Sequence, residues 1–349
     1  MRAERHESYH LLLGPSIVSV SDELQTSMGA HLERHVGLIE AGKLTNAAYL
    51  RLMRDGIDVA KELLHQEGVI TPAQEFNIRG FLYDLAFQVA PHAREDELAE
   101  LIKRMGLREG DKVVDLMSGT GFVSTRVPEI THWGVYAVDS SYVQLALQLL
   151  RTGPPYPHKN KVWLVKADPS CPELTEKITE GEIDVADSLG GLHHVPNQRQ
   201  RCLFANVARL LKVGGRFVFG DVTDMEAGLP LVRHFEHTSS RCVTGHVGYW
   251  LNEKRLREEI LPGLPLRILS IEVVPTRWHF DSLEQITLFF MGLHALDADI
   301  TTQNLQDNVI LDEIREFLGI ERIGDTYFVG WPLMYAELER VHGEVPKGI

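Results

Sequence analysis

The spacing of apolar residues changes part-way along the chain and divides it into two regions. In the first region apolar residues recur every three or four positions, which predicts helices over 21–42, 45–68 and 95–105. A capping box that begins at Thr71, with proline at the first helical position, predicts another helix. We therefore expect residues 1–105 to form a helical region that acts as a lid or in oligomerisation.

In the second region short β-rich runs alternate with helical patterns. Five strands are predicted, over residues 112–117, 134–139, 161–168, 183–190 and 216–222. The helices between them are predicted to begin near Gly121, to cover 141–151, to form a short turn near Glu173, and to cover 198–215 with a Gly-Gly cap. This alternation is typical of a doubly wound parallel sheet whose two faces are both covered.

Beyond residue 222 the pattern is less regular, and residues 223–249 have no clear period. Two more strands are predicted over 266–274 and 326–338, and helices over 251–261, 282–296 and 308–318. The second of these helices opens with a capping box from Ser282 to Gln285. The predicted fold is α/β: a Rossmann-like, seven-stranded core over 106–349, with insertions at about 223–249 and 281–325 that add to the lid.

Composition narrows the classes of function. The chain has 349 residues, 44% of them hydrophobic, and a formal net charge of −14. A surface this acidic repels phosphate backbones, so we do not expect a nucleic-acid substrate. Three cysteines without a CxxC motif fit a reducing compartment, and neither a signal peptide nor a membrane span is expected. We therefore predict a cytoplasmic protein.

The stretch VVDLMSGTGFVS, residues 113–124, carries the main chemical signal. Gly119 and Gly121 follow a predicted strand, where bare backbone lets a ligand approach the sheet edge. Asp139 ends the next predicted strand, and a carboxylate at that place can accept hydrogen bonds from both hydroxyls of a ribose. Asp168 ends the third predicted strand. The pattern predicts a site for an adenosine-containing cofactor.

Two residues argue against a nicotinamide dinucleotide. The fingerprint Gly-x-Gly-x-x-Gly needs a third glycine for close helix packing, and this chain has Ser124 there. Asp115 lies at the end of the first predicted strand, where a carboxylate would repel a pyrophosphate. A cofactor without phosphate and with a cationic end suits this loop better, although an NAD-dependent Rossmann enzyme stays an alternative.

The segment from Asp115 to Gly121 resembles the first motif of the class I S-adenosylmethionine-dependent methyltransferases, and the resemblance continues through DVADSLGGLHHV and ARLLKVGGRFVFGD. It implies S-adenosyl-L-methionine as the cofactor, with Asp139 on the ribose and Asp168 on the adenine amino group. Met117 departs from the family pattern, which usually has a small residue there; its backbone can face the cofactor while its side chain points into the core. The implied cofactor-binding residues are Asp115, Met117, Ser118, Gly119, Gly121, Asp139, Ser140, Tyr142, Asp168, Pro169 and Leu189.

The resemblance implies methyl transfer but does not identify the substrate. Because large lids and an acidic surface suit a small molecule, we predict C- or N-methylation of an aromatic or heterocyclic metabolite such as an indole, in the manner of natural-product tailoring enzymes. The alternative is a protein that binds the same cofactor but does other chemistry, such as cyclisation. A homodimer is left open.

Histidines and aromatic residues near the predicted fourth and fifth strands are the catalytic candidates. We select His194, His237 and Tyr249. The alternative for His194 is a structural role, and the alternative for His237 and Tyr249 is a plain surface loop. His234 and His237 could meet on one helical face, but a metal site needs a third ligand and Glu236 would point elsewhere. No metal site is predicted.

Overall fold

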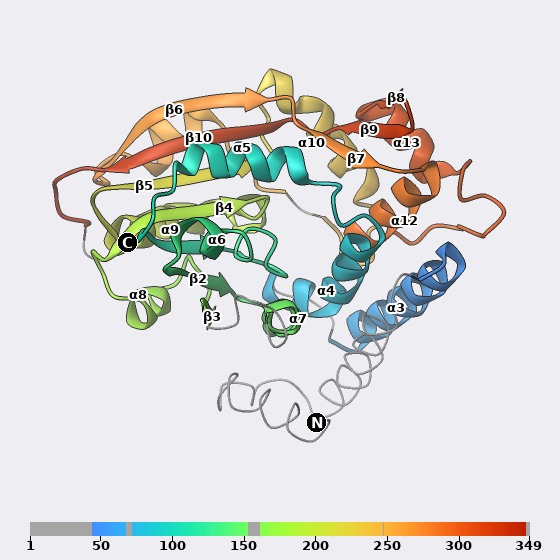
Figure 1. The fold of residues 1–349 in the computed structure, drawn as a ribbon, viewed down its shortest axis with the longest axis horizontal. Helices are drawn as coiled ribbons and strands as arrows, with labels where there is room; N and C mark the ends of the chain where they lie inside the picture. The colour runs from blue at the N-terminus through green and yellow to red at the C-terminus, as the bar shows by residue number, and fades with distance from the viewer. Residues whose placement is uncertain (1–43, 68–71, 153–160, 247, 347–349) are drawn as a thin grey trace.

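The computed structural model describes residues 44–67, 72–152, 161–246 and 248–346. The helix predicted over 21–42 and the capping residue Thr71 lie outside these ranges. A seven-stranded sheet forms the centre of the molecule (Figure 1). Its spatial order is β3 (Val162–Lys166), β2 (Gly134–Asp139), β1 (Lys112–Leu116), β4 (Ile183–Leu189), β5 (Leu211–Asp221), β10 (Leu333–Arg340) and β6 (Leu266–Val274).

The first five strands of this order are parallel, and β10 runs antiparallel between β5 and β6. Alternate residues of the central strands enter different hydrophobic clusters: Val113 belongs to one and Val114 to the other. On β5, Val218 likewise belongs to the first cluster and Phe217 to the second. Both faces of the sheet are therefore buried, as the predicted doubly wound fold requires.

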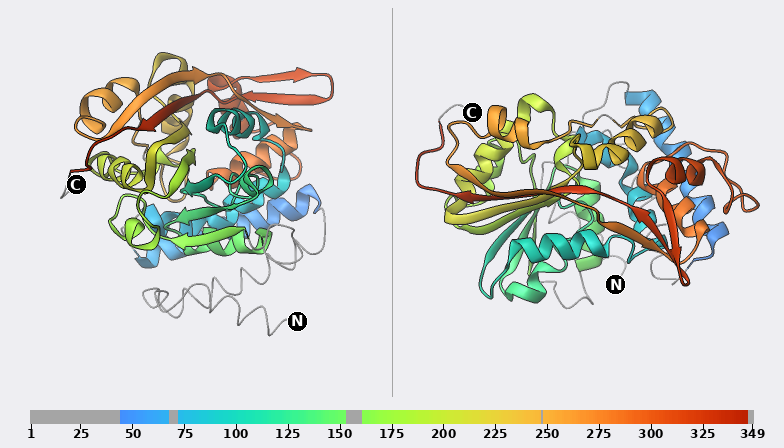
Figure 2. Two further views of the ribbon diagram at one scale, coloured as in Figure 1. Left: turned by 60° about the vertical axis from the view of Figure 1, so that its left-hand side comes forward. Right: turned by 90° about the horizontal axis from the view of Figure 1, so that it is seen from above.

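Helices cover the two faces, as Figure 2 shows in the view from above. Leu101 of α5 (Glu95–Met105) and Val127 of α6 (Val127–Thr131) pack in the cluster that contains Val113. Leu174 of α8 (Glu173–Lys177) and Phe204 of α9 (Asn197–Leu210) pack in the other. Because α5 contacts β4, β5 and β10, part of the predicted N-terminal region belongs to the sheet's own layers.

A second group of helices lies at one end of the sheet (Figure 1). It comprises α3 (Asn46–Glu67), α4 (Pro72–Val89), α10 (Leu229–Thr238), α12 (Leu283–Leu293) and α13 (Val309–Phe317). Helix α4 packs against α3, against α12 and against α7 (Tyr142–Thr152). Within the described ranges, no helix has the length and apolar character needed to cross a bilayer.

Two predicted helix boundaries are wrong, one start and one end, because the glycines at these places do not mark where the helix begins or ends. The helix predicted from Gly121 begins at Val127, after a series of turns. The helix predicted over 198–215 ends at Leu210, and the Gly-Gly pair lies inside β5. Gly215 is needed there for space, since a Cβ atom would come within 2.9 Å of the Lys212 carbonyl oxygen.

Three further elements differ from the prediction. The run 326–338 forms two strands in different sheets: β9 (Thr326–Gly330) pairs antiparallel with β7 (Arg277–Phe280) and β8 (Ile320–Ile323), while β10 joins the main sheet. The run 251–261 forms α11 (Glu253–Arg255) and a π-helical turn over Leu256–Ile260. Helix α10 lies where no period was found. The capping residue Ser282 is confirmed, and its hydroxyl accepts from the Gln285 amide at 3.2 Å.

Candidate functional site

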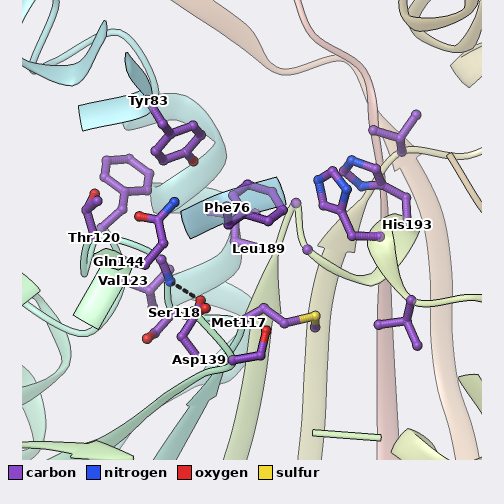
Figure 3. Close-up of a pocket in the computed structure, with 18 of the residues that line it drawn as sticks. Phe76, Tyr83, Met117, Ser118, Thr120, Val123, Asp139, Gln144, Leu189 and His193 are labelled. Atoms are coloured by element: carbon purple, nitrogen blue, oxygen red, sulfur yellow. Dashed lines mark hydrogen bonds between the residues drawn. The ribbon is translucent and has the colours of Figure 1, made fainter. Parts of the chain in front are cut away.

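A cavity of about 410 Å³ opens at the carboxyl ends of β1, β2 and β4, the edge where parallel sheets bind ligands. It has two ends. We call the first the loop end; it is lined by Asp115, Met117, Ser118, Gly119, Asp139, Ser140, Asp168 and Pro169. We call the second the histidine chamber; it is lined by Phe76, Arg79, His193, His194, Phe235, His246, Leu293, His294 and Trp331. Figure 3 shows Phe76 and His193 around the same cavity as Met117 and Asp139.

The turn after β1 adopts the left-handed backbone region repeatedly, with φ of +56° at Met117, +54° at Gly119 and +91° at Gly121. The position where methyltransferases usually have a small residue is thus strained for methionine, by about 1–2 kcal/mol. Gly191 provides the space, because a Cβ atom there would lie 2.7 Å from the Met117 Cβ. The Met117 side chain lines the cavity and also packs against the core, so it does not simply point inward as expected.

Asp139 is held by backbone amides on both oxygens. Its Oδ2 accepts from the Gly119 amide at 2.9 Å and its Oδ1 from the Ser141 amide at 2.8 Å. Burial raises the pKa of Asp139 to about 6, and these amide donors oppose that rise. A carboxylate has about four lone-pair sites, so Asp139 can still accept from a ligand hydroxyl.

Asp115 lies beneath the loop and is almost fully buried. Burial raises its pKa to about 7, while the Ser124 hydroxyl, which donates to its Oδ2, acts in the opposite direction. Asp187 is its register partner on β4, and burial also holds the pKa of that carboxyl well above its usual range. Two neighbouring carboxyl groups that are both buried away from water are more stable when they share one proton than when both carry a negative charge.

Of the other predicted cofactor-binding residues, some line the cavity and some do not. Asp168 lines the cavity, pairs with Arg199 at 3.0 Å and accepts from the Ser170 amide at 2.9 Å. Leu189 also lines the cavity. Gly121 and Tyr142 do not; Tyr142 packs with a small cluster that contains Val143.

The histidine chamber is assembled from segments far apart in sequence. His193 and His194 lie in the 3₁₀ turn after β4, and Phe76 and Arg79 come from α4. An isolated antiparallel β-bridge between the backbones of Cys242 and Leu296 joins the segment after α10 to the segment after α12. That bridge brings His246 and His294 to the same wall, with ring centroids 6.0 Å apart.

Three imidazoles of the chamber are held neutral. Burial lowers the pKa of His194, His246 and His294 well below the ordinary histidine range, and neighbouring cationic or histidine groups lower it further. His194 packs edge-on against Phe76 with centroids 4.8 Å apart. At neutral pH these rings therefore offer lone pairs rather than positive charge.

A buried polar network borders the chamber, and the sequence patterns did not reveal it. The Arg94 guanidinium pairs with Glu97 and donates to the Tyr83 hydroxyl at 2.8 Å. Glu97 in turn accepts from the Trp278 indole at 3.1 Å, and Trp278 stacks on Trp331 at 3.5 Å. All five of these residues line the cavity.

Of the three catalytic candidates, His194 alone lines the cavity. His237 is half exposed and pairs with Glu313 at 3.0 Å. Tyr249 contributes its backbone amide, which donates to the His193 carbonyl at 2.8 Å, but its side chain is not part of the lining. His234, considered with His237 as a metal ligand, is buried among aromatic rings and has a pKa lowered to about 3 by burial.

Comparison with known proteins supports the fold. No protein-family model matches the chain, and no curated protein matches it by sequence. Among solved structures, a phosphoethanolamine N-methyltransferase of Haemonchus contortus, in complex with phosphomonomethylethanolamine and S-adenosylhomocysteine, superposes with a TM-score of 0.50 and 17% identity, over 78% of this chain and 61% of that one. A geranyl diphosphate C-methyltransferase from Streptomyces coelicolor gives 0.43 and 16%, over 71% and 77%. The chain therefore has the Rossmann-like fold that the Haemonchus methyltransferase also has.

Proposed function

We propose that this chain is an S-adenosylmethionine-dependent methyltransferase that acts on a small aromatic or heterocyclic molecule. The observation that carries the proposal is the continuity of one cavity, which runs from the glycine loop and Asp139 to a chamber of aromatic and imidazole rings. A donor at one end and an acceptor at the other would share an enclosure that excludes water, and positioning of this kind supplies much of the catalysis of such a transfer.

The loop end fits the cofactor. Asp139 lines the cavity and can accept from a ribose hydroxyl, and the Asp168 carboxylate lies at the adjacent strand end. When bound, S-adenosylmethionine supplies an activated methyl group on a sulfonium. Ser124 weighs against the NAD alternative, because its side chain bonds Asp115 at the position where the dinucleotide fingerprint requires glycine.

The chamber fits a flat, partly polar acceptor. Phe76 and Phe235 offer ring faces and edges, while His194 offers a neutral nitrogen that can take a proton from an acceptor atom. Because His237 and Tyr249 lie outside the lining, the proposal assigns them no catalytic role. An indole remains one example of the acceptor, and a cytoplasmic location and a homodimer stay predictions.

Two measurements test this proposal. In a thermal-shift screen, S-adenosylhomocysteine should stabilise the full chain, and NAD and NADP should not. Incubation with methyl-labelled S-adenosylmethionine and a set of small aromatic metabolites should then move the label to a low-mass product. Binding without any label transfer would favour the non-methylating alternative, and stabilisation by NAD alone would overturn the cofactor assignment.

A further inference from the structure

Three imidazoles of the histidine chamber converge on one point. One ligand atom from each of His193, His194 and His246 lies within 4.8 Å of the other two. The ring centroids are 4.1 Å apart for His193 and His194, and 5.1 Å apart for His194 and His246. Two separate segments, the turn after β4 and the loop after α10, are needed to make this group.

His246 is short of a hydrogen-bond partner. Neither of its ring nitrogens has one among the described residues, although the residue is only 7% exposed. Buried polar groups are normally satisfied, because an unpaired one costs about 1–3 kcal/mol. Since His246 lines the cavity, an occupant of the chamber can supply what the protein does not.

His193 is oriented by a carboxylate that does not itself reach the chamber. Asp221 Oδ1 lies 2.6 Å from His193 Nδ1. The Asp221 carboxylate is itself fixed by the Leu192 amide at 2.6 Å and the Val222 amide at 2.7 Å. An imidazole that donates from Nδ1 to a carboxylate presents its Nε2 lone pair, and this is the usual arrangement behind a metal-ligating histidine.

We propose that His193, His194 and His246 bind one divalent transition-metal ion of the zinc class. Neutral imidazoles are the nitrogen donors that such ions prefer, and three protein ligands with a fourth position open are typical of catalytic zinc sites. Tetrahedral Zn–N bonds of 2.0–2.1 Å place ligand nitrogens about 3.4 Å apart, so the rings move together on binding by about 1 Å. The open position faces the chamber.

The role of the ion in turnover rests on the proposed function, whereas its binding does not. A hydroxyl, thiol or ring N–H of the acceptor that occupied the open position would lose its proton to water more readily. The freed electron pair would then form a bond to the methyl carbon as the sulfur–methyl bond breaks, and sulfur would keep that bond's electrons as a neutral thioether. His194 would act as a ligand in this scheme and not as the base.

Metal titration of the full chain, first stripped with a chelator, tests the site. Co²⁺ should bind at one ion per chain and give the visible absorption of a four-coordinate nitrogen site, and Zn²⁺ should displace it. His246→Ala should weaken binding by more than about 100-fold, beyond the roughly 10–100-fold that loss of a supporting residue commonly causes. His92→Ala is the matched control, because that imidazole is 83% exposed and outside the cavity. The affinity of this variant for the metal ion should be the same as that of the wild type.

His194→Gln provides a second variant if His246→Ala does not fold, and S-adenosylhomocysteine binding reports whether each variant is intact. Absence of Co²⁺ and Zn²⁺ binding at micromolar concentration overturns the inference, as does unchanged affinity in an intact His246→Ala or His194→Gln chain. S-adenosylhomocysteine binding without metal binding would remove only the metal site. Metal binding without S-adenosylhomocysteine binding would remove only the proposed methyl-donor site.

Discussion

The loop end and the histidine chamber are two halves of one cavity with different origins. The loop end is made by residues at or just beyond the carboxyl ends of β1, β2 and β3, so each functional side chain is placed by its own strand. The chamber takes residues from α4, from the turn after β4, from the loop after α10 and from α12. One half therefore depends on local structure, and the other depends on how distant segments dock.

Of the changes considered, Trp278→Ala should have the largest effect on the free energy of unfolding, and it should act on the side of the histidine chamber. Trp278 is 1% exposed, stacks on Trp331 and donates to Glu97. Its truncation should lower the free energy of unfolding by about 3–5 kcal/mol, as measured by urea denaturation. Trp163→Ala, at a 38% exposed position on the edge strand, should cost less than half of that. Equal losses would mean that the chamber wall is not a packed core.

Asp139→Ala should act on the loop end and leave the chamber intact. The change removes the acceptor for the Gly119 and Ser141 amides, and it would also remove the proposed acceptor for the ribose hydroxyls. We expect S-adenosylhomocysteine binding to weaken by about 1–3 kcal/mol in calorimetry. Asp325→Ala, a fully exposed carboxylate elsewhere, is the control. If Asp139→Ala bound the cofactor as the wild type does, the ribose assignment would be wrong.

Asp115→Asn should change how the stability of the ligand-free chain depends on pH. The native pKa of Asp115 is raised to about 7 by burial, above the unfolded value near 4. Its contribution to stability is therefore fully present below pH 4 and is lost as the pH rises through 7. We compare the free energy of unfolding of the asparagine variant with that of the wild type. This difference should favour the variant by about 1 kcal/mol more at pH 8 than at pH 5, or by a larger amount. A gain that does not change with pH would contradict the raised pKa.

Met117→Gly should have the smallest effect on stability. Glycine removes the cost of a positive φ, about 1–2 kcal/mol, and also removes the contacts of a half-buried side chain, which stabilise by a similar amount. We expect a free energy of unfolding within about 1 kcal/mol of wild type and little change in cofactor affinity. A loss of several kcal/mol would show that the side chain is a main support of the loop.

The contrast between the halves also explains what the sequence could predict. The parallel strands, Asp139 and the glycine loop follow from apolar runs and from residues within a few positions of a strand end. Ser282 is predictable as a cap because its partner, Gln285, is three residues away. Interactions over such short spans leave a readable pattern.

The histidine chamber has no such short-range pattern in the sequence. His193 is oriented by Asp221, 28 positions away, and the Glu97 partner Trp278 is 181 positions away. His246 lies within residues 223–249, where the sequence has no clear period, and its neighbours depend on the β-bridge between Cys242 and Leu296. Two selected candidates, His237 and Tyr249, were equally plausible by residue type, and tertiary packing places their side chains outside the lining.

The position of β10 has a consequence for the order of assembly. This strand is the last of the sheet in the chain, yet it lies between β5 and β6, and Trp331 and Leu333 at its start border the cavity. During synthesis β5 leaves the ribosome long before its neighbour, so its edge stays open until residues 333–340 arrive. The histidine chamber is thus among the last parts to form, and nascent chains carry a bare β5 edge that must avoid pairing with other chains.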